Sequence, residues 1–240
     1  MKNSFFNQFT GLIKNGNVFA SQDATHMNPA DALASARKTR DAIVQGQPMT
    51  MDSRGTIHSK NDDNSLNRHN VSEIKGGNKF AIQWYENDKK LYEFEFNEMK
   101  KTFPQAELSV LKDDRLCWNI TFDGILDSYG YEHSWSFMLI YDSDHPHDKY
   151  DGGSIKVYPI KPSVGEMITM AQNSGKGRVP HLRQDDFDNI ILCTAPASQV
   201  QVNRHKAVSA ITVATWTVSW ATHFQQGLTD NSVWEKFKQD

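Results

Sequence analysis

Apolar and polar residues alternate through the middle of the chain, in the pattern of half-buried β-strands. The apolar positions are Ala106, Leu108 and Val110, then Leu116, Trp118, Ile120 and Phe122, then Trp135, Phe137, Leu139 and Tyr141, and finally Ile155 and Val157. The connections between these segments are short, whereas parallel pairing needs a crossover of about a dozen residues or more. The alternation therefore predicts a four-stranded antiparallel meander.

Helical periods flank the predicted meander. Before it, Tyr92, Phe96, Met99 and Phe103 predict a helix that ends ahead of Pro104. After it, a second helix is predicted by Val208, Ile211, Ala214, Val218 and Ala221, with Trp216, Trp220 and Phe224 as a further stripe. Gly227 is the expected stop of that helix. Between residues 159 and 186, prolines and glycines interrupt every period, so we expect an irregular segment there. The order of elements predicts the α+β class.

Residues 1–77 differ in pattern from the rest of the chain. Residues 29–46 predict a helix, because Asn28 can cap it and Pro29 suits its first turn. Residues 47–77 are polar and show neither a helical nor a strand period, which favours a linker. We therefore predict an N-terminal extension over residues 1–77 and a folded domain over residues 78–240.

Composition and charge exclude several classes of protein. A net charge of −3 over 240 residues gives no basic footprint, so no nucleic-acid partner is expected. No run of about 18 apolar residues is present, and no membrane association is expected. The first residues lack the pattern of a secretory signal. Two cysteines, Cys117 and Cys193, supply neither a disulfide framework nor a zinc site, which favours a reducing cytoplasm.

The two cysteines differ as candidate nucleophiles. Cys193 follows the apolar run Ile190-Ile191-Leu192 and is either a reactive thiol or a buried structural cysteine. Cys117 belongs to a predicted strand and is interpreted as structural. His145 and His147 bracket a proline among aspartates, but no further ligand follows at metal-binding spacing. We interpret that segment as a solvated turn and predict no metal site.

Several segments resemble the ubiquitin-conjugating family, in particular its bacterial relatives. Residues 99–104, followed by a strand with Trp118, resemble its opening helix, Phe-Pro pair and first strands. Residues 144–159 resemble its tight connection between the third and fourth strands. The stretch from Pro180-His181 to Leu192-Cys193 resembles the histidine-led segment that runs into the active-site cysteine. Residues 207–224 resemble the helix that follows, and the likeness covers about residues 86–226.

The resemblance implies a fold, a chemistry and partners. The fold would be a helix, a four-stranded meander, a cysteine loop and a C-terminal helix. Cys193 would accept an acyl group as a thioester, and His181 would stabilise the oxyanion, since the eukaryotic asparagine is absent here. Asp186 and Asp188, beside Asp185, would orient or deprotonate the incoming lysine, although a solvated acidic loop is the alternative interpretation. The implied partners are an adenylating activating enzyme, a ubiquitin-like modifier or another protein tail, and a target protein.

No cofactor is implied by this resemblance, and bacterial members commonly accompany antiphage defence operons. A second hypothesis is a catalytically inactive binding or scaffold module of the same fold. The missing asparagine and the long segment before Cys193 favour that alternative. The accessibility and reactivity of Cys193 distinguish the two hypotheses.

Overall fold

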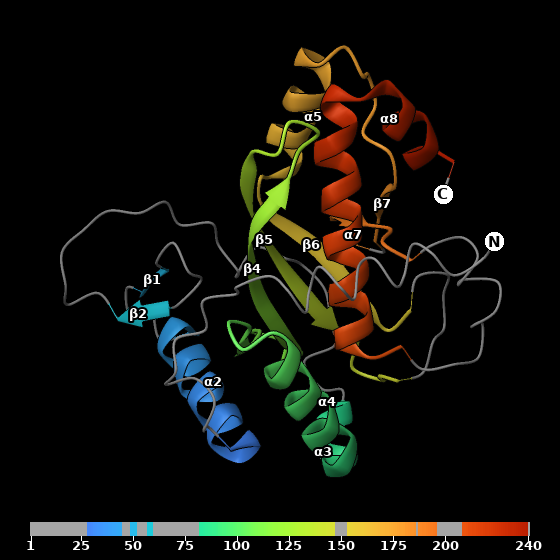
Figure 1. Cartoon of the computed structure of the whole chain (residues 1–240). Coiled ribbons are helices and arrows are strands. Elements are labelled where there is room, and N and C mark those ends of the chain that lie inside the picture. The colour runs from blue at the N-terminus through green and yellow to red at the C-terminus, as the bar shows by residue number, and fades with distance from the viewer. Residues whose placement is uncertain are drawn as a thin grey trace.

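A six-stranded antiparallel sheet forms the centre of the protein (Figure 1). The computed structural model describes residues 28–44, 49–51, 57–59, 82–146, 153–185, 187–195 and 208–239. The strands lie in the order β3-β4-β5-β6-β8-β7. Their bounds are β3 Glu107–Val110, β4 Leu116–Leu126, β5 Glu132–Tyr141, β6 Ile155–Lys161, β7 Leu182–Gln184 and β8 Ile190–Leu192. The α+β class is therefore confirmed.

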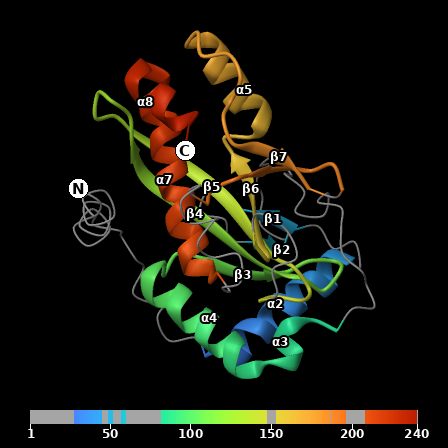
Figure 2. The same cartoon turned by 90° about the vertical axis from the view of Figure 1, so that its right-hand side faces the viewer.

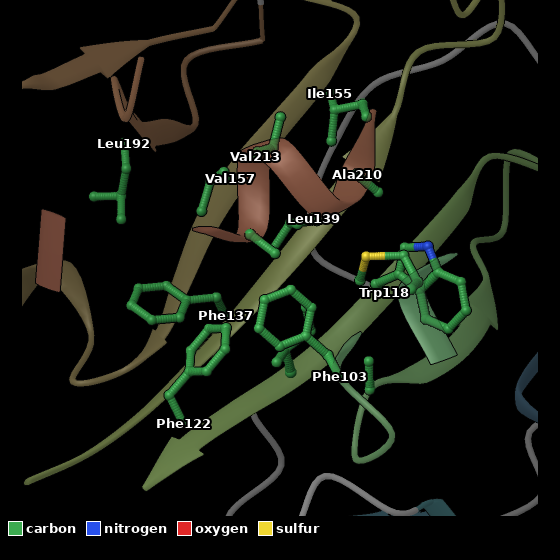
Figure 3. Close-up of a cluster of buried hydrophobic side chains, with 14 of the residues drawn as sticks. Phe103, Trp118, Phe122, Phe137, Leu139, Ile155, Val157, Leu192, Ala210 and Val213 are labelled. Carbon is green, nitrogen blue, oxygen red and sulfur yellow. The ribbon is translucent and has the colours of Figure 1, made fainter. Parts of the chain in front are cut away.

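The predicted meander corresponds to β3–β6, and its alternation sets one face of the sheet. Trp118 pairs with Leu108 on β3 and with Leu139 on β5, and Leu139 pairs with Val157 on β6. Because side chains alternate between faces along a strand, these paired apolar residues share one face. Trp118, Leu139 and Val157 are buried together in the main core (Figure 3), and the partly buried Leu108 packs against it.

The sheet nevertheless has six strands rather than four. The segment predicted to be irregular contains the end of β6, the helix α5 (Val164–Asn173) and the strand β7. Strand β8 pairs with β6 through Leu192 and Val157, and β7 pairs with β8. Both added strands have only three residues, which is too short for an alternating pattern to be detected in the sequence. Their extended conformation depends on pairing with neighbouring strands.

Helices cover the face of the sheet that carries Trp118. Helix α7 (Ala210–Thr229) crosses this face and contacts β4, β5 and β6, as Figures 1 and 2 show. Helix α4 (Lys89–Thr102) packs against α7 and is preceded by the short helix α3 (Trp84–Asn87). Helix α8 (Asn231–Phe237) follows α7 in the chain. The prediction that Gly227 ends α7 is wrong. The helix continues to Thr229, and Gly227 serves close packing against Trp234.

The opposite face of the sheet carries a smaller buried cluster. It consists of Leu111, Cys117, Met138, Ile140 and Tyr158. Cys117, Met138, Ile140 and Tyr158 occupy the alternate positions of β4, β5 and β6, and Leu111 directly follows β3. Both faces of the central strands are therefore buried, although the alternation suggested that only one would be.

Helix α2 (Pro29–Val44) joins the main core. Its predicted cap is confirmed, since the Asn28 Oδ1 accepts a 2.9 Å hydrogen bond from the backbone of Asp31. Ala32 and Ala36 are buried in the main core, and α2 contacts α4 and β3. The Tyr92 hydroxyl donates a 2.7 Å hydrogen bond to the carbonyl of Pro29. The first turns of α2 thus pack with residues 82–239 across the boundary predicted at residue 77.

The segment predicted as a polar linker contains two short strands. β1 (Met49–Met51) pairs antiparallel with β2 (Ile57–Ser59), so the expectation of no strand is wrong there. Residues 45 and 46, the predicted end of the preceding helix, lie outside the described residues. In the part of the chain that the structure describes, no helix is both long enough and apolar enough to cross a membrane.

Candidate functional site

Cys193 lies at the open end of the β7–β8 hairpin, beside His181. Strand pairing runs from Gln184 and Ile190 near the turn to Leu182 and Leu192. One position further, the backbone nitrogen of Cys193 donates a 2.8 Å hydrogen bond to the carbonyl of His181. The structure therefore brings these two sequence-predicted residues together through their backbones, and the Cys193 side chain is half-buried.

The imidazole of His181 is engaged by the C-terminal helix. Its Nε2 forms a short hydrogen bond with the carbonyl of Phe237 on α8, and the two rings lie 5.2 Å apart between centroids. A carbonyl oxygen only accepts, so Nε2 carries the proton and Nδ1 of the neutral ring is an acceptor. In this arrangement a neutral His181 has no free N–H to donate to an oxyanion.

Asp185 closes the turn of the hairpin. Its Oδ1 accepts from the backbone nitrogens of Phe187 and Asn189, both at 2.9 Å. Its Oδ2 accepts from the Tyr158 hydroxyl and the Asn189 amide, both at 2.8 Å. Partial burial acts to raise the pKa of Asp185, but hydrogen bonds from Asn189 and Tyr158 outweigh it and lower that pKa. Asp185 thus fixes the geometry of the hairpin that carries Cys193.

The other predicted acidic residues are not placed beside the thiol. Asp188 is exposed at the turn, with a φ of 63°. Asn189 and the three residues of β8 separate it from Cys193, and β8 alone spans about 10 Å. Asp186 lies outside the described residues. Among the predicted acidic residues that the structure describes, none therefore lies next to Cys193 along the hairpin.

Cys117 is sealed in the smaller buried cluster. Its side chain is fully buried, and burial raises the pKa of its thiol to about 12. A thiol is a nucleophile as the thiolate, so Cys117 is unreactive near neutral pH. Of the two cysteines, Cys193 is the more exposed.

A buried polar cluster beneath α7 was missed from the sequence. Glu95 on α4 is only 3% exposed, and its Oε2 accepts from the backbone of Ala210 at 2.8 Å and from the Tyr141 hydroxyl at 3.0 Å. Burial raises the pKa of Glu95, while the hydrogen bonds from Ala210 and Tyr141 oppose that rise. Glu95 lies three residues after Tyr92 and four before Met99, so the spacing alone places it on the buried side of α4.

His145 belongs to this cluster, so the prediction of a solvated turn is wrong for this residue. The ring is 3% exposed and lies 4.7 Å from the Trp84 ring and 4.9 Å from the Tyr141 ring, measured between centroids. Its Nδ1 lies 2.7 Å from the Ser154 hydroxyl. His147 is outside the described residues. Within the described ranges, no three metal-ligating side chains form a group that could hold a metal ion.

Comparison of the chain with protein-family models, curated proteins and solved structures gave no match.

Proposed function

We propose that this protein is a ubiquitin-conjugating-like acyltransferase with Cys193 as the thioester-forming residue. The observation that carries the proposal is the contrast between the two thiols. Cys193 is half-buried at the end of a strand, whereas Cys117 is fully buried. The antiparallel meander and the helix after Cys193 are consistent with the resemblance noted in the sequence.

The proposed reaction has two steps. The Cys193 thiolate attacks the carbonyl carbon of an acyl group bound to an adenylating activating enzyme. A new C–S bond forms, and the bond that joined the acyl carbon to the activating enzyme breaks. An amine of the target then attacks the thioester, the C–S bond breaks and the thiolate leaves, while a base accepts the proton of the amine. The acyl group would be the carboxyl terminus of a ubiquitin-like modifier or another protein tail. A reducing cytoplasm would keep the thiol free, and bacterial antiphage defence is the proposed setting.

The surroundings of Cys193 also favour a second candidate, a binding module of the same fold without transfer chemistry. The His181 imidazole is held by Phe237, and Asp188 lies at the far end of the hairpin. An enzyme would then need an oxyanion donor other than neutral His181. In the module, the hairpin would serve only as part of the scaffold.

The thiol contrast can be tested without knowing the partners. The native full-length protein is treated with N-ethylmaleimide, and the alkylated residue is identified by mass spectrometry. We expect alkylation of Cys193 while Cys117 stays unmodified, and Cys117→Ser should react like the wild type. If both thiols resist until the protein unfolds, the enzyme proposal fails.

Transfer itself is tested with the cognate activating enzyme, modifier and ATP. The expected product is an adduct that thiol reductants release, retained in Cys117→Ser. Cys193→Ser should give either no adduct or a slowly formed ester that resists reductants, because an alcohol is a weaker nucleophile than a thiol. Alkylation of Cys193 without any adduct would favour the binding module.

A further inference from the structure

The tip of the β4–β5 hairpin displays two tyrosines that the fold does not use. Tyr129 is 73% exposed and Tyr131 is 69% exposed. Among the described residues, neither ring stacks on another aromatic ring, whereas the buried aromatic side chains do so extensively. Exposed aromatic residues gathered at one site are typical of interaction surfaces.

The backbone beneath these tyrosines is held rigidly. The Asp127 Oδ1 accepts hydrogen bonds from the backbone nitrogens of Tyr129, at 2.8 Å, and Tyr131, at 2.9 Å. The nitrogen of Asp127 also bonds to the carbonyl of Tyr131 at 3.0 Å. Gly130, between the tyrosines, has a φ of 86°, a conformation that glycine adopts readily. The two rings are therefore presented from one fixed turn.

The tip is also fastened to the end of α7. The Ser128 hydroxyl donates a 2.8 Å hydrogen bond to the carbonyl of Gln226 and accepts one of 2.8 Å from the Thr229 hydroxyl. Figure 1 shows the hairpin reaching the end of α7 from which α8 begins. A turn that is fixed on both sides loses little conformational entropy when a partner binds, and rigid tyrosines supply contact area at low entropic cost.

The charge of the hairpin indicates which kind of partner it would bind. Asp123 and Glu132 are exposed on its two strands. The sequence contains no lysine or arginine between Arg115 and Lys149. This acidic character disfavours nucleic acid, whose phosphates would be repelled. A guanidinium can stack on a tyrosine ring and pair with a carboxylate at the same time.

We propose that the tip of the β4–β5 hairpin, residues 123–132, is a docking surface for an arginine-bearing segment of a partner protein. Tyr129 and Tyr131 stack on guanidinium groups of this segment, and the carboxylates of Asp123 and Glu132, further along the two strands, attract its other arginines. This surface is built from residues other than Cys193 and its hairpin, so the proposal does not rest on the proposed acyl transfer.

The test uses the full-length protein and a fluorescein-labelled nona-arginine peptide, with binding followed by fluorescence anisotropy. We expect the double variant Tyr129→Ala, Tyr131→Ala to weaken binding by about fivefold or more, since each exposed cation–π contact contributes a few-fold. Asp123→Asn with Glu132→Gln should weaken it as well. Neither pair touches the core, so thermal unfolding should be unchanged.

A matched control is available on the other hairpin. Phe187 is also an exposed aromatic residue, 46% exposed, and is next to Asp188. Phe187→Ala should leave nona-arginine binding unchanged. Equal losses in Phe187→Ala and in the double tyrosine variant would show unspecific attraction to acidic aromatic sites and overturn the proposal. The proposal would also be overturned if the wild type failed to bind the peptide. The same holds if nona-lysine bound equally well and its binding were unaffected by the tyrosine substitutions.

Discussion

The backbone nitrogen of Ala210 donates a 2.8 Å hydrogen bond to the buried carboxylate of Glu95, which joins the first turn of α7 to α4. The first backbone N–H groups of a helix have no partner within the helix. The positive end of the helix dipole also lies there and favours a carboxylate. The same oxygen accepts from the Tyr141 hydroxyl at 3.0 Å, and Tyr141 accepts from the Trp118 indole at 3.1 Å. One carboxyl group thus connects α4, α7 and the centre of the sheet.

The first prediction concerns the pH dependence of stability caused by Glu95. Burial raises the pKa of Glu95 in the folded protein above its unfolded value, so the folded state favours the protonated form. The contribution of Glu95 to the free energy of unfolding is fully present below the unfolded pKa, about 4.3. It is lost as the pH rises through the higher folded pKa. Urea unfolding across that range should give a wild-type free energy that falls relative to Glu95→Gln as the pH rises.

The control for this experiment is Glu93→Gln, since Glu93 is exposed on the same helix. We expect Glu93→Gln to follow the wild type at every pH. A wild-type free energy that stays parallel to that of Glu95→Gln, or rises relative to it with pH, would contradict the prediction.

The second prediction concerns the contact between α7 and α8. A Cβ on Gly227 would lie 2.8 Å from Cε3 and 3.3 Å from Cα of Trp234. Because the buried Trp234 ring must shift and its backbone is also in tight contact, Gly227→Ala should lower the free energy of unfolding by about 1–3 kcal/mol. Gly165→Ala in α5 is the control, since its Cβ would meet nothing within 4 Å. That variant should be neutral or more stable in urea unfolding, and an equal loss in both variants would show that the contact is not the cause.

The third prediction concerns helix α2. A truncated protein that starts at Asn78 loses Ala32 and Ala36 from the core and leaves the Tyr92 hydroxyl without the Pro29 carbonyl. We expect it to unfold at a lower temperature than a protein that starts at Asn28, because the apolar core surface that Ala32 and Ala36 cover becomes exposed to water. Equal transition temperatures by circular dichroism would show that α2 contributes nothing to the core.

Much of the fold follows from local patterns in the sequence. Alternation placed Trp118 and Leu139 on one buried face, and both are 1% exposed or less. Helix α2 was found from its cap, but its packing was not, because it inserts alanines, which form no marked apolar stripe. Helix α5 begins with a capping box between Ser163 and Glu166, a readable signal that the surrounding prolines and glycines obscured.

The candidate site was predictable only in part, because its chemistry depends on tertiary contacts. The sequence singled out Cys193 and His181, and strand pairing does bring their backbones together. Nothing local indicates that Phe237, 56 residues further on, engages the His181 imidazole. Nor does alternation show that the second face of the sheet is also packed. The burial of Cys117 in the smaller cluster on that face was therefore not predictable from the strand pattern.

The last prediction concerns Asp185 and the hairpin that carries Cys193. Asp185→Asn replaces one carboxylate oxygen by an amide, which cannot accept from both Tyr158 and the Asn189 side chain. We expect the hairpin to open more often, so the amide of Cys193, bonded to the His181 carbonyl, should exchange hydrogen several-fold faster. The measurement is hydrogen exchange in the native full-length protein near neutral pH.

Asp188→Asn is the matched control for this experiment, since asparagine tolerates the φ of 63° and Asp188 is exposed. The control should exchange like the wild type. The pKa of Asp185 is lowered, so its contribution is present above the unfolded pKa of about 3.9 and is lost as the pH falls through the lower folded value. After correction for intrinsic exchange, the wild type should therefore approach Asp185→Asn only below about pH 4. Equal exchange of the two variants at neutral pH would show that Asp185 does not hold the hairpin closed.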